Sequence, residues 1–206
     1  MHAYPSDIAF TESVKAVQTQ KGSRSQYARM EQRSGWQTKV TAELKTFLSE
    51  LDMFYLGTAS QSGQPYIQYR GGSPGFLKVL DQSTLGFADF AGNQQFITLG
   101  NLAENPQAFL FLIDYVQRRR VKIWGTARSV EDDPELLAQL HDPAYPGRVE
   151  RAILFTVTAW DINCPQHIHP RLPQADVLKL VEQLQTENQQ LKAEQARLHM
   201  KMESGL

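Results

Sequence analysis

Hydrophobic residues recur at helical spacing just after Trp36. The positions are Val40, Leu44, Phe47, Leu48 and Leu51. Steps of three and four residues predict a helix over residues 40–51 with one apolar face turned to a core. Thr41 and Glu43 suit its first turns.

Beyond Asp52 the pattern changes to short apolar or alternating segments, each closed by Gly, Pro, Asn or Asp, which predicts strands. We expect them at Met53–Ala59, Gln64–Arg70, Phe76–Leu80, Thr84–Asp89, Ala108–Asp114, Arg119–Val130 and Ala152–Trp160. Ser60-Gln61-Ser62-Gly63 predicts a hairpin turn. Six or seven closely spaced strands indicate an antiparallel barrel or sandwich, mainly β with helices outside, rather than βαβ units.

Two helices are expected between these strands. One covers Asn93–Asn101 and stops before Pro106. The other starts at Asp133-Pro134-Glu135, since proline and acidic residues favour a first helical turn. Asp142–Arg148, which contains two prolines and a glycine, is expected to be a loop.

The two ends of the chain differ from this central part, which we assign to residues 38–172 as one domain. Residues 1–37 are polar and predict an N-terminal arm, broken near Gly22–Ser25, with Ile8, Phe10, Val14 and Val17 available for burial. A loose tail is the alternative.

Residues 173–206 follow a heptad pattern. Val177, Leu184, Leu191 and Leu198 are seven apart, and Val181, Asn188, Gln195 and Met202 occupy the complementary position. Leucines at one position, an asparagine at the other and Glu187 placed to reach Lys192 of a partner predict a parallel two-stranded coiled coil. The alternative is a long helix that packs its leucines on its own domain.

Composition narrows the protein class. The chain has 206 residues with 41% hydrophobic residues, and 21 Lys+Arg against 22 Asp+Glu give a net charge of −1. This composition can bury a core, and it argues against a protein that holds nucleic acid by neutralising phosphates. Cys164 is the single cysteine and no leader peptide is recognisable, so we expect a reducing cytoplasm. No apolar run approaches the ~20 residues of a membrane span.

Two glycine-bearing segments are candidates for binding a ligand. Arg70-Gly71-Gly72-Ser73 opens the first, which ends at Lys78; its glycines permit close approach, and Arg70 can offer a planar fork of donors to a phosphate. A surface turn with an exposed arginine explains it equally well. The second is Gly92-Asn93-Gln94-Gln95, which we expect at a helix N-terminus that attracts anions. Neither segment matches a P-loop or a Gly-x-Gly-x-x-Gly motif.

Arg118, Arg119, Arg120 and Lys122 form the dense basic run of the chain. Strand alternation would send Arg118, Arg120 and Lys122 to one face, and Arg119 with Val121 and Ile123 to the other. One arginine could then face a ligand groove while others stay in solvent. A nucleic-acid patch is the rival interpretation.

Cys164, His167 and His169 could supply a nucleophile or metal ligands, but no second half-site accompanies them, and we expect no metal. We interpret this stretch as a structural loop. No arrangement suggests hydrolysis, and Asp89 and Asp114, at predicted strand ends, are interpreted as turn formers.

The order of these motifs resembles the pyridoxamine 5'-phosphate oxidase-like split-barrel flavoproteins, and more narrowly the branch described as predicted flavin-nucleotide-binding proteins. The motifs are Arg70-Gly-Gly-Ser-Pro-Gly-Phe, Gly92-Asn-Gln-Gln, Asn101-Leu with Asn105-Pro, Arg119-Arg-Val-Lys-Ile-Trp-Gly and Trp160-Asp-Ile-Asn-Cys-Pro-Gln-His-Ile. The resemblance implies a six-stranded antiparallel Greek-key split β-barrel with peripheral helices, homodimeric, with FMN at the subunit interface. The C-terminal helix lies outside the common pattern.

The resemblance also implies roles for particular residues. Arg70, Gly71, Ser73 and Lys78 would bind the phosphate and ribityl side of FMN, with further contacts from Gly92, Asn93, Gln94 and Gln95. Arg120 would lie near the flavin ring, and Cys164 with His167 in a loop closing over it. Phe76, Phe90 and Trp124 are candidate walls for the ring.

Two departures from the family pattern narrow the range of expected substrates. The oxidase's Arg-Lys pair is Gln94-Gln95 here, and its substrate motif is not recognisable, so pyridoxamine phosphate is a poor candidate substrate. We expect an FMN-dependent oxidoreductase that uses NAD(P)H or another small molecule, with catalytic residues unassigned. The alternatives are a flavin- or haem-binding module without turnover, for which His141, His167 and His169 are candidate haem ligands, and a dimeric scaffold.

Overall fold

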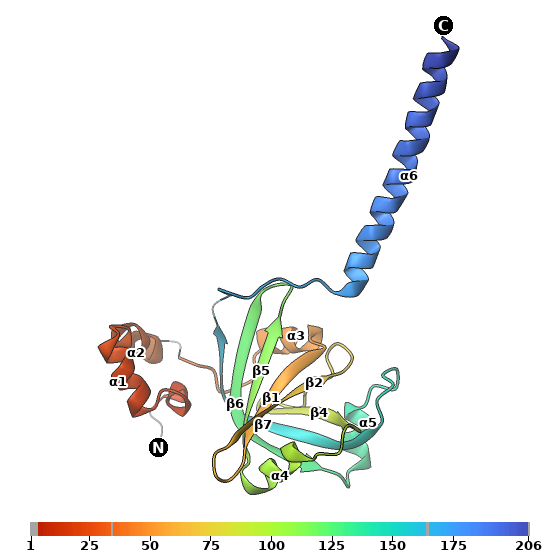
Figure 1. Cartoon of the computed structure of the whole chain (residues 1–206). Coiled ribbons are helices and arrows are strands. Elements are labelled where there is room, and N and C mark those ends of the chain that lie inside the picture. The colour runs from red at the N-terminus through yellow and green to blue at the C-terminus, as the bar shows by residue number, and fades with distance from the viewer. Residues whose placement is uncertain (1–3, 34, 164, 206) are drawn as a thin grey trace. The chain divides into compact units, whose positions relative to one another are not determined.

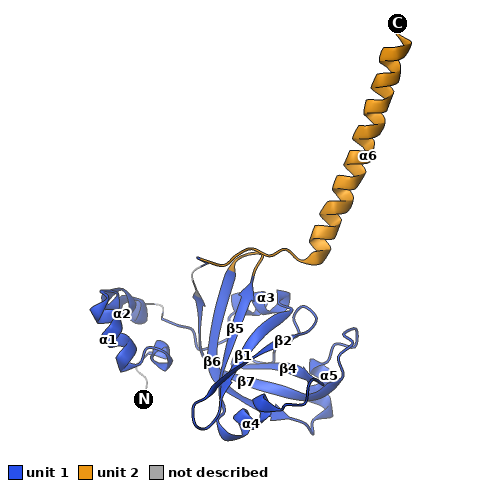
Figure 2. Ribbon diagram, in the orientation of Figure 1, with its two compact units in different colours: residues 1–114, 119–166 blue, residues 115–118, 167–206 orange. Residues whose placement is uncertain are grey.

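The computed structural model describes residues 4–33, 35–163 and 165–205 (Figure 1). Cys164, one of the candidate site residues, therefore lies outside the described residues. The chain divides into two units, residues 1–114 with 119–166 and residues 115–118 with 167–206 (Figure 2).

One antiparallel sheet forms the frame of the first unit. Its strands, within the described residues, are β1 (Met53–Ala59), β2 (Pro65–Gly71), β3 (Lys78–Val79), β4 (Thr84–Phe90), β5 (Gln107–Asp114), β6 (Arg119–Val130) and β7 (Val149–Asn163). They hydrogen-bond in the order β2-β1-β5-β6-β7-β4-β3, and the hairpin turn at Ser60–Gly63 joins β1 to β2 as predicted. The fold class, a split β-barrel with peripheral helices, is confirmed.

The sheet has one strand more than the six implied by the resemblance. The extra strand, β3, has two residues, which pair with Gly86 and Leu85 of β4. The strand predicted at Phe76–Leu80 is shorter because the backbone N–H of Phe76 closes a turn on the carbonyl of Ser73, at 2.9 Å. Strand pairing therefore begins only at Lys78.

The core lies on the inner face of this sheet. Along β1 the side chains alternate, so that Phe54 and Leu56 are fully buried while Tyr55 points outward. The predicted first helix is α3 (Ala42–Glu50), which buries Leu44, Phe47 and Leu48 in the same core. The Thr41 hydroxyl caps it by accepting from the Leu44 N–H at 3.2 Å.

The other helices of the first unit are η1 (Pro5–Ile8), α1 (Glu12–Gln20), α2 (Arg24–Arg33), α4 (Ile97–Glu104) and α5 (Pro134–Leu140). α5 starts where predicted, and the Asp133 carboxylate accepts from the Leu136 N–H at 2.9 Å. α4 starts later than predicted, because Gln94 and Phe96 have φ values of 59° and 52°, which no α-helix accommodates. Asn93–Gln95 therefore belong to a loop, not to a helix.

Aromatic rings fasten the N-terminal arm to the barrel. The Phe10 ring lies 5.2 Å from Trp36, and the Trp36 indole stacks on Trp124 of β6 with centroids 4.5 Å apart. The expected burial of Val14 and Val17 is wrong: their exposed fractions are 37% and 54%. α1 instead buries Gln18, which accepts a hydrogen bond from Arg24 of α2.

The second unit contains α6 (Gln174–Ser204), a helix of 31 residues. Every residue of this helix is exposed. None of the helices in the described part of the chain is long and apolar enough to cross a membrane.

Candidate functional site

Two rows of side chains cross the outer face of the sheet. Each row consists of successive pairing partners on β2, β1, β5 and β6. The first row is Ile67, Gly57, Phe109 and Trp124, and the second row is Tyr69, Tyr55, Phe111 and Lys122. Their alternate neighbours fill the core, so strand geometry alone places these rings outside. The exposed fractions of Ile67 and Tyr69 are 68% and 58%.

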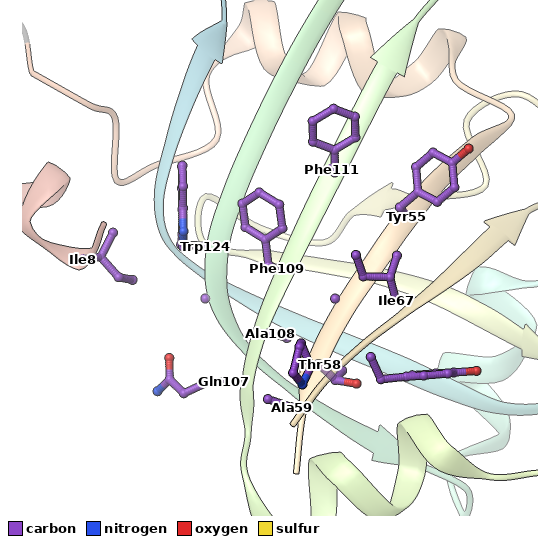
Figure 3. Close-up of a pocket in the computed structure, with 14 residues that line it drawn as sticks. Ile8, Tyr55, Thr58, Ala59, Ile67, Gln107, Ala108, Phe109, Phe111 and Trp124 are labelled. Carbon is purple, nitrogen blue, oxygen red and sulfur yellow. The ribbon is translucent and has the colours of Figure 1, made fainter. Parts of the chain in front are cut away.

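These rows form an aromatic groove of about 690 Å³. Figure 3 shows Tyr55, Phe109, Phe111 and Trp124 along the strands, with Ile8 of the arm near one end. Gly57 leaves room for Phe109, whose Cβ would lie 3.5 Å from an added Cβ. The groove is wide enough for a flat aromatic ligand or for side chains of a second protein surface.

A small polar pocket of about 50 Å³ shares Tyr66 with the groove, although its residues Gln68 and Arg70 leave β2 on the face opposite to Ile67 and Tyr69. Arg70 at the end of β2, the loop residues Gly92, Asn93, Gln94 and Gln95, and the start of α4 line it. The structure thus brings together five of the candidate residues from both glycine segments. An added Cβ at Gly92 would meet nothing within 4 Å, so this glycine is not required by packing.

Asp89 organises this polar pocket. Its buried carboxylate accepts from the Arg70 guanidinium and from Nη1 of Arg151 at 3.1 Å. Arg70 also donates to the Thr98 hydroxyl at 3.2 Å, and Thr98 donates to the Gln68 side chain at 3.0 Å. The interpretation of Asp89 as a turn former is therefore wrong, since it lies within β4 and holds two arginines.

Arg151 was missed by the sequence reasoning. It lies on β7, pairs with Asp89, Glu131 and Glu150, and its guanidinium lies 5.6 Å from the Phe96 ring centroid. Hydrogen bonds to Glu131 and Asp89 outweigh burial and raise its pKa. A lone carboxylate in the apolar stretch Leu85–Phe90 was the available signal, because a buried charge requires a partner.

Ser73 and Lys78 interact with Asp142 and not with the residues of the polar pocket. The Ser73 hydroxyl hydrogen-bonds to Asp142, and together with the Ala144 N–H and the charge of Lys78 it lowers the pKa of that carboxyl. Gly71 lies beside the Tyr69 ring, where an added Cβ would come within 2.9 Å of a ring carbon. These residues follow Arg70 in sequence but do not line the polar pocket.

The basic residues Arg118, Arg119, Arg120 and Lys122 do not all lie on one face of β6. Val121 and Ile123 are buried and Arg119 stacks over Phe47 at 5.1 Å, whereas Lys122 is on the outer face, as predicted. Arg118 is the exception, because it lies in a turn with φ 53°.

Lys122 has an aromatic setting. Its ammonium lies 5.8 and 5.2 Å from the ring centroids of Trp36 and Trp124. Burial lowers the pKa of Lys122 and raises that of Asp161, its pairing partner on β7, although each charge partly offsets the shift of the other. Arg120, two residues earlier on the same face of β6, further lowers the pKa of Lys122.

Among the remaining candidates Phe90 lines the polar pocket, whereas His167 does not. His167 is exposed, with φ 62°, and belongs to the second unit. Phe76 is a core residue, 5% exposed, and lines neither the groove nor the polar pocket. Phe90 packs on Tyr145 at 4.9 Å and lines both the polar pocket and a neighbouring cavity of about 210 Å³. Among the described residues, no cluster of three His, Cys, Asp or Glu side chains could hold a metal ion.

A family model described as pyridoxamine 5'-phosphate oxidase matches residues 40–180, more than half of the chain. The chain belongs to this family. The match begins two residues before α3 and includes every strand of the split barrel, so the polar pocket and all of the groove except Ile8 lie within it. Members of the family typically bind flavins.

Several solved structures are similar to this chain at low sequence identity. HupZ from Group A Streptococcus is 17% identical, with 64% of this chain and 98% of that chain covered and a TM-score of 0.49. An FMN-binding protein from Syntrophomonas wolfei is 10% identical, with 71% and 97% covered and a TM-score of 0.48. HutZ, the haem storage protein from Vibrio cholerae, is 18% identical, with 58% and 90% covered and a TM-score of 0.39. No curated protein matches the sequence significantly.

Proposed function

We propose that this chain binds FMN as a homodimer and serves as an FMN-dependent oxidoreductase for a small substrate, in the cytoplasm. The observation that carries the proposal is the polar pocket around Arg70, which shares Tyr66 with the aromatic groove. FMN has the matching division into a polar tail and a flat aromatic ring.

The polar pocket offers hydrogen-bond donors for the ribityl and phosphate groups of FMN. The charged side chains of one copy, however, do not neutralise the phosphate. Asn93, Gln94 and Gln95 offer amide groups for the hydroxyls of a ribityl chain. The charged side chains that line the pocket are two arginines, Arg70 and Arg151, and two carboxylates, Asp89 and Glu150. Their sum is zero, so a phosphate dianion needs further cations.

A second copy can supply these cations, which is why we propose a homodimer with FMN at the interface. Arg120 and Lys122 lie on β6, and Lys122 is on the same outer face as the groove. In a two-fold symmetric dimer the same surface patch serves both copies, so a basic side chain beside one groove can approach the pocket of the other copy. Ser73 and Lys78 remain candidate phosphate ligands, provided that Ser73 gives up its hydrogen bond to Asp142 when the phosphate binds.

Bound FMN would supply the acceptance and donation of hydride. The chain's own residues would bind and orient it. Arg70, fixed by Asp89 and Thr98, presents its guanidinium in one direction, and the rings of the groove exclude water from the flavin. Arg120 would donate to the polar edge of the ring, and the loop with Cys164 and His167 would cover it.

Titration of the purified protein with FMN, followed by flavin fluorescence, tests the proposal. Arg70→Ala is expected to weaken FMN binding by about 1.5–3 kcal/mol, the cost of a lost charge-assisted hydrogen bond. Arg128→Ala, which changes an exposed arginine on β6, is the matched control and should bind as the parent does. Failure of the parent protein to take up FMN would overturn the proposal, and unchanged affinity in Arg70→Ala would remove Arg70 from the site.

One observation favours a second candidate function, a module that binds its ligand without turnover. The charged side chains of the polar pocket, Arg70, Asp89, Glu150 and Arg151, are engaged in ion pairs with one another. None of these is therefore ready to act as a general acid or base. Addition of NADH or NADPH without oxygen separates the candidates: bleaching of the flavin indicates an oxidoreductase, and persistent yellow colour indicates a binding module.

The same module could take haem instead of flavin. The candidate axial ligands His141, His167 and His169 are exposed side chains. Titration with haemin, followed by its absorbance with and without the triple substitution of these histidines by alanine, tests this version. Haem uptake that is unaffected by the substitution excludes axial ligation by these residues.

A further inference from the structure

α6 presents an apolar stripe of exposed side chains. Its leucines Leu184, Leu191 and Leu198 have exposed fractions of 55%, 58% and 55%. Exposed leucines seven residues apart on a helix of 31 residues require a partner, since single chains rarely leave such a stripe in water.

The spacing assigns each residue a heptad position. Val177 and the three leucines occupy d, while Val181, Asn188, Gln195 and Met202 occupy a. Leucine at d, together with an asparagine at a, favours two strands in a parallel arrangement, because the two asparagines can hydrogen-bond only when they face one another. Against an apolar barrel surface, Asn188 and Gln195 would lose their hydrogen bonds to water without replacement.

Charge at the flanking positions supports the same partner. Glu187 and Glu194 occupy g, and Lys192 and His199 occupy the following e positions. In a parallel pair each g residue faces the e residue five positions further along the other chain, so Glu187 meets Lys192 and Glu194 meets His199. An antiparallel pair would bring g positions together, and Glu187 and Glu194 would repel one another.

We propose that α6 pairs with α6 of a second copy as a parallel, in-register, two-stranded coiled coil. The helix of 31 residues gives a rod of about 46 Å at 1.5 Å per residue. This contact uses none of the residues of the groove or of the polar pocket, so it joins two copies whether or not a flavin is bound.

Disulfide trapping in the full-length chain tests pairing and direction together. In a Cys164→Ser background, single cysteines are introduced at two d positions, Leu184→Cys and Leu198→Cys, and at one c position, Gln190→Cys, as the matched control. In a parallel in-register pair each d residue faces its own copy, whereas c residues point away. Each variant is oxidised mildly at about 10 μM protein and followed on non-reducing gels, with helix content checked by circular dichroism.

Both d variants are expected to form covalent dimers roughly a hundredfold faster than the c variant, the ratio of a millimolar effective concentration to the protein concentration used. In an antiparallel pair a residue faces its own copy only at the two-fold axis, so at most one of positions 184 and 198 could cross-link and at least one would fail. Such a failure, or equal rates in all three variants, would overturn the proposal. FMN binding is unaffected by these outcomes, so they are independent of the proposed function.

Discussion

Asp89 lies between two guanidinium groups on a strand that is otherwise apolar. Its side chain is 7% exposed, and the side chains of Arg70 and Arg151 are 13% and 12% exposed. Such a group is stable only while its partners remain, because an unpaired buried charge carries most of its desolvation cost. Asp89 therefore fixes where Arg70 can point, and it also lowers the positive charge available to a phosphate.

Asp89→Asn tests this positioning role. The amide keeps the shape but removes the charge shared by two arginines, so we expect the free energy of unfolding to fall by about 3 kcal/mol, the lower end for breaking a buried pair. Urea unfolding measures the change, with the exposed Asp132→Asn as control. A fall no larger than that of the control would mean that Arg151 and Arg70 are satisfied without Asp89.

The sequence could identify Arg70 as a candidate but not its partners. The glycines around Arg70 mark a close approach, which is a local signal. Asp89 and Arg151 are 62 residues apart and meet only because β4 pairs with β7 in the register Asp89 to Arg151. No local pattern determines that pairing, and the prediction for the last strand, which began at Ala152, started three residues after Val149 and left out Arg151.

At the scale of elements, Trp36 links the N-terminal arm to the barrel. It is 6% exposed, stacks on Trp124 and contacts Phe10, which in turn packs against Tyr27 of α2 at 5.3 Å. The backbone adds a bridge between Gln37 and Trp160. Because Trp124 also lines the aromatic groove, the arm supports one wall of it.

Trp36→Ala is expected to release the arm while the barrel stays folded. Loss of a buried tryptophan costs about 3–5 kcal/mol, and here the loss falls on the contact that holds the arm. Limited trypsin digestion should cut at Lys21, Arg24, Arg29 or Arg33 far faster than in the parent, while the barrel fragment survives. The control is Val17→Ala on the exposed face of α1. Equal digestion rates in the parent and Trp36→Ala would show that the arm is held elsewhere.

Elements with a regular pattern were predictable, and those set by a few backbone angles were not. Alternation revealed the strands, the Thr41 and Asp133 caps marked two helix starts, and the heptads predicted the extent of α6. The late start of α4 depends on left-handed backbone at Gln94 and Phe96, two residue types that give no signal of it. Consequently Asn93, Gln94 and Gln95 line the polar pocket with Arg70 from a loop and not from the predicted helix.

At the scale of the whole molecule, the proposed contacts with a second copy use two separate surfaces. The aromatic groove lies within the barrel unit, and the leucine stripe lies on α6 in the other unit. Contacts that join the same two chains assist one another, since the first to form raises the effective concentration for the second. The two surfaces are therefore best tested separately and in combination.

Ile67→Asp places a charge in the groove at a residue that is 68% exposed, so it should change monomer stability by no more than about 0.5 kcal/mol. The double substitution Leu184→Asp with Leu191→Asp places charges at two exposed positions of the proposed coiled coil. We expect the α6 variant to stay dimeric and to keep FMN, and the groove variant to dissociate more readily on dilution and to lose FMN, because its interface site is broken. The combined variant should be monomeric, as measured by analytical ultracentrifugation. If the α6 variant alone became monomeric, the barrel face would not be the main contact, and a flavin site shared by two barrels would lose its basis.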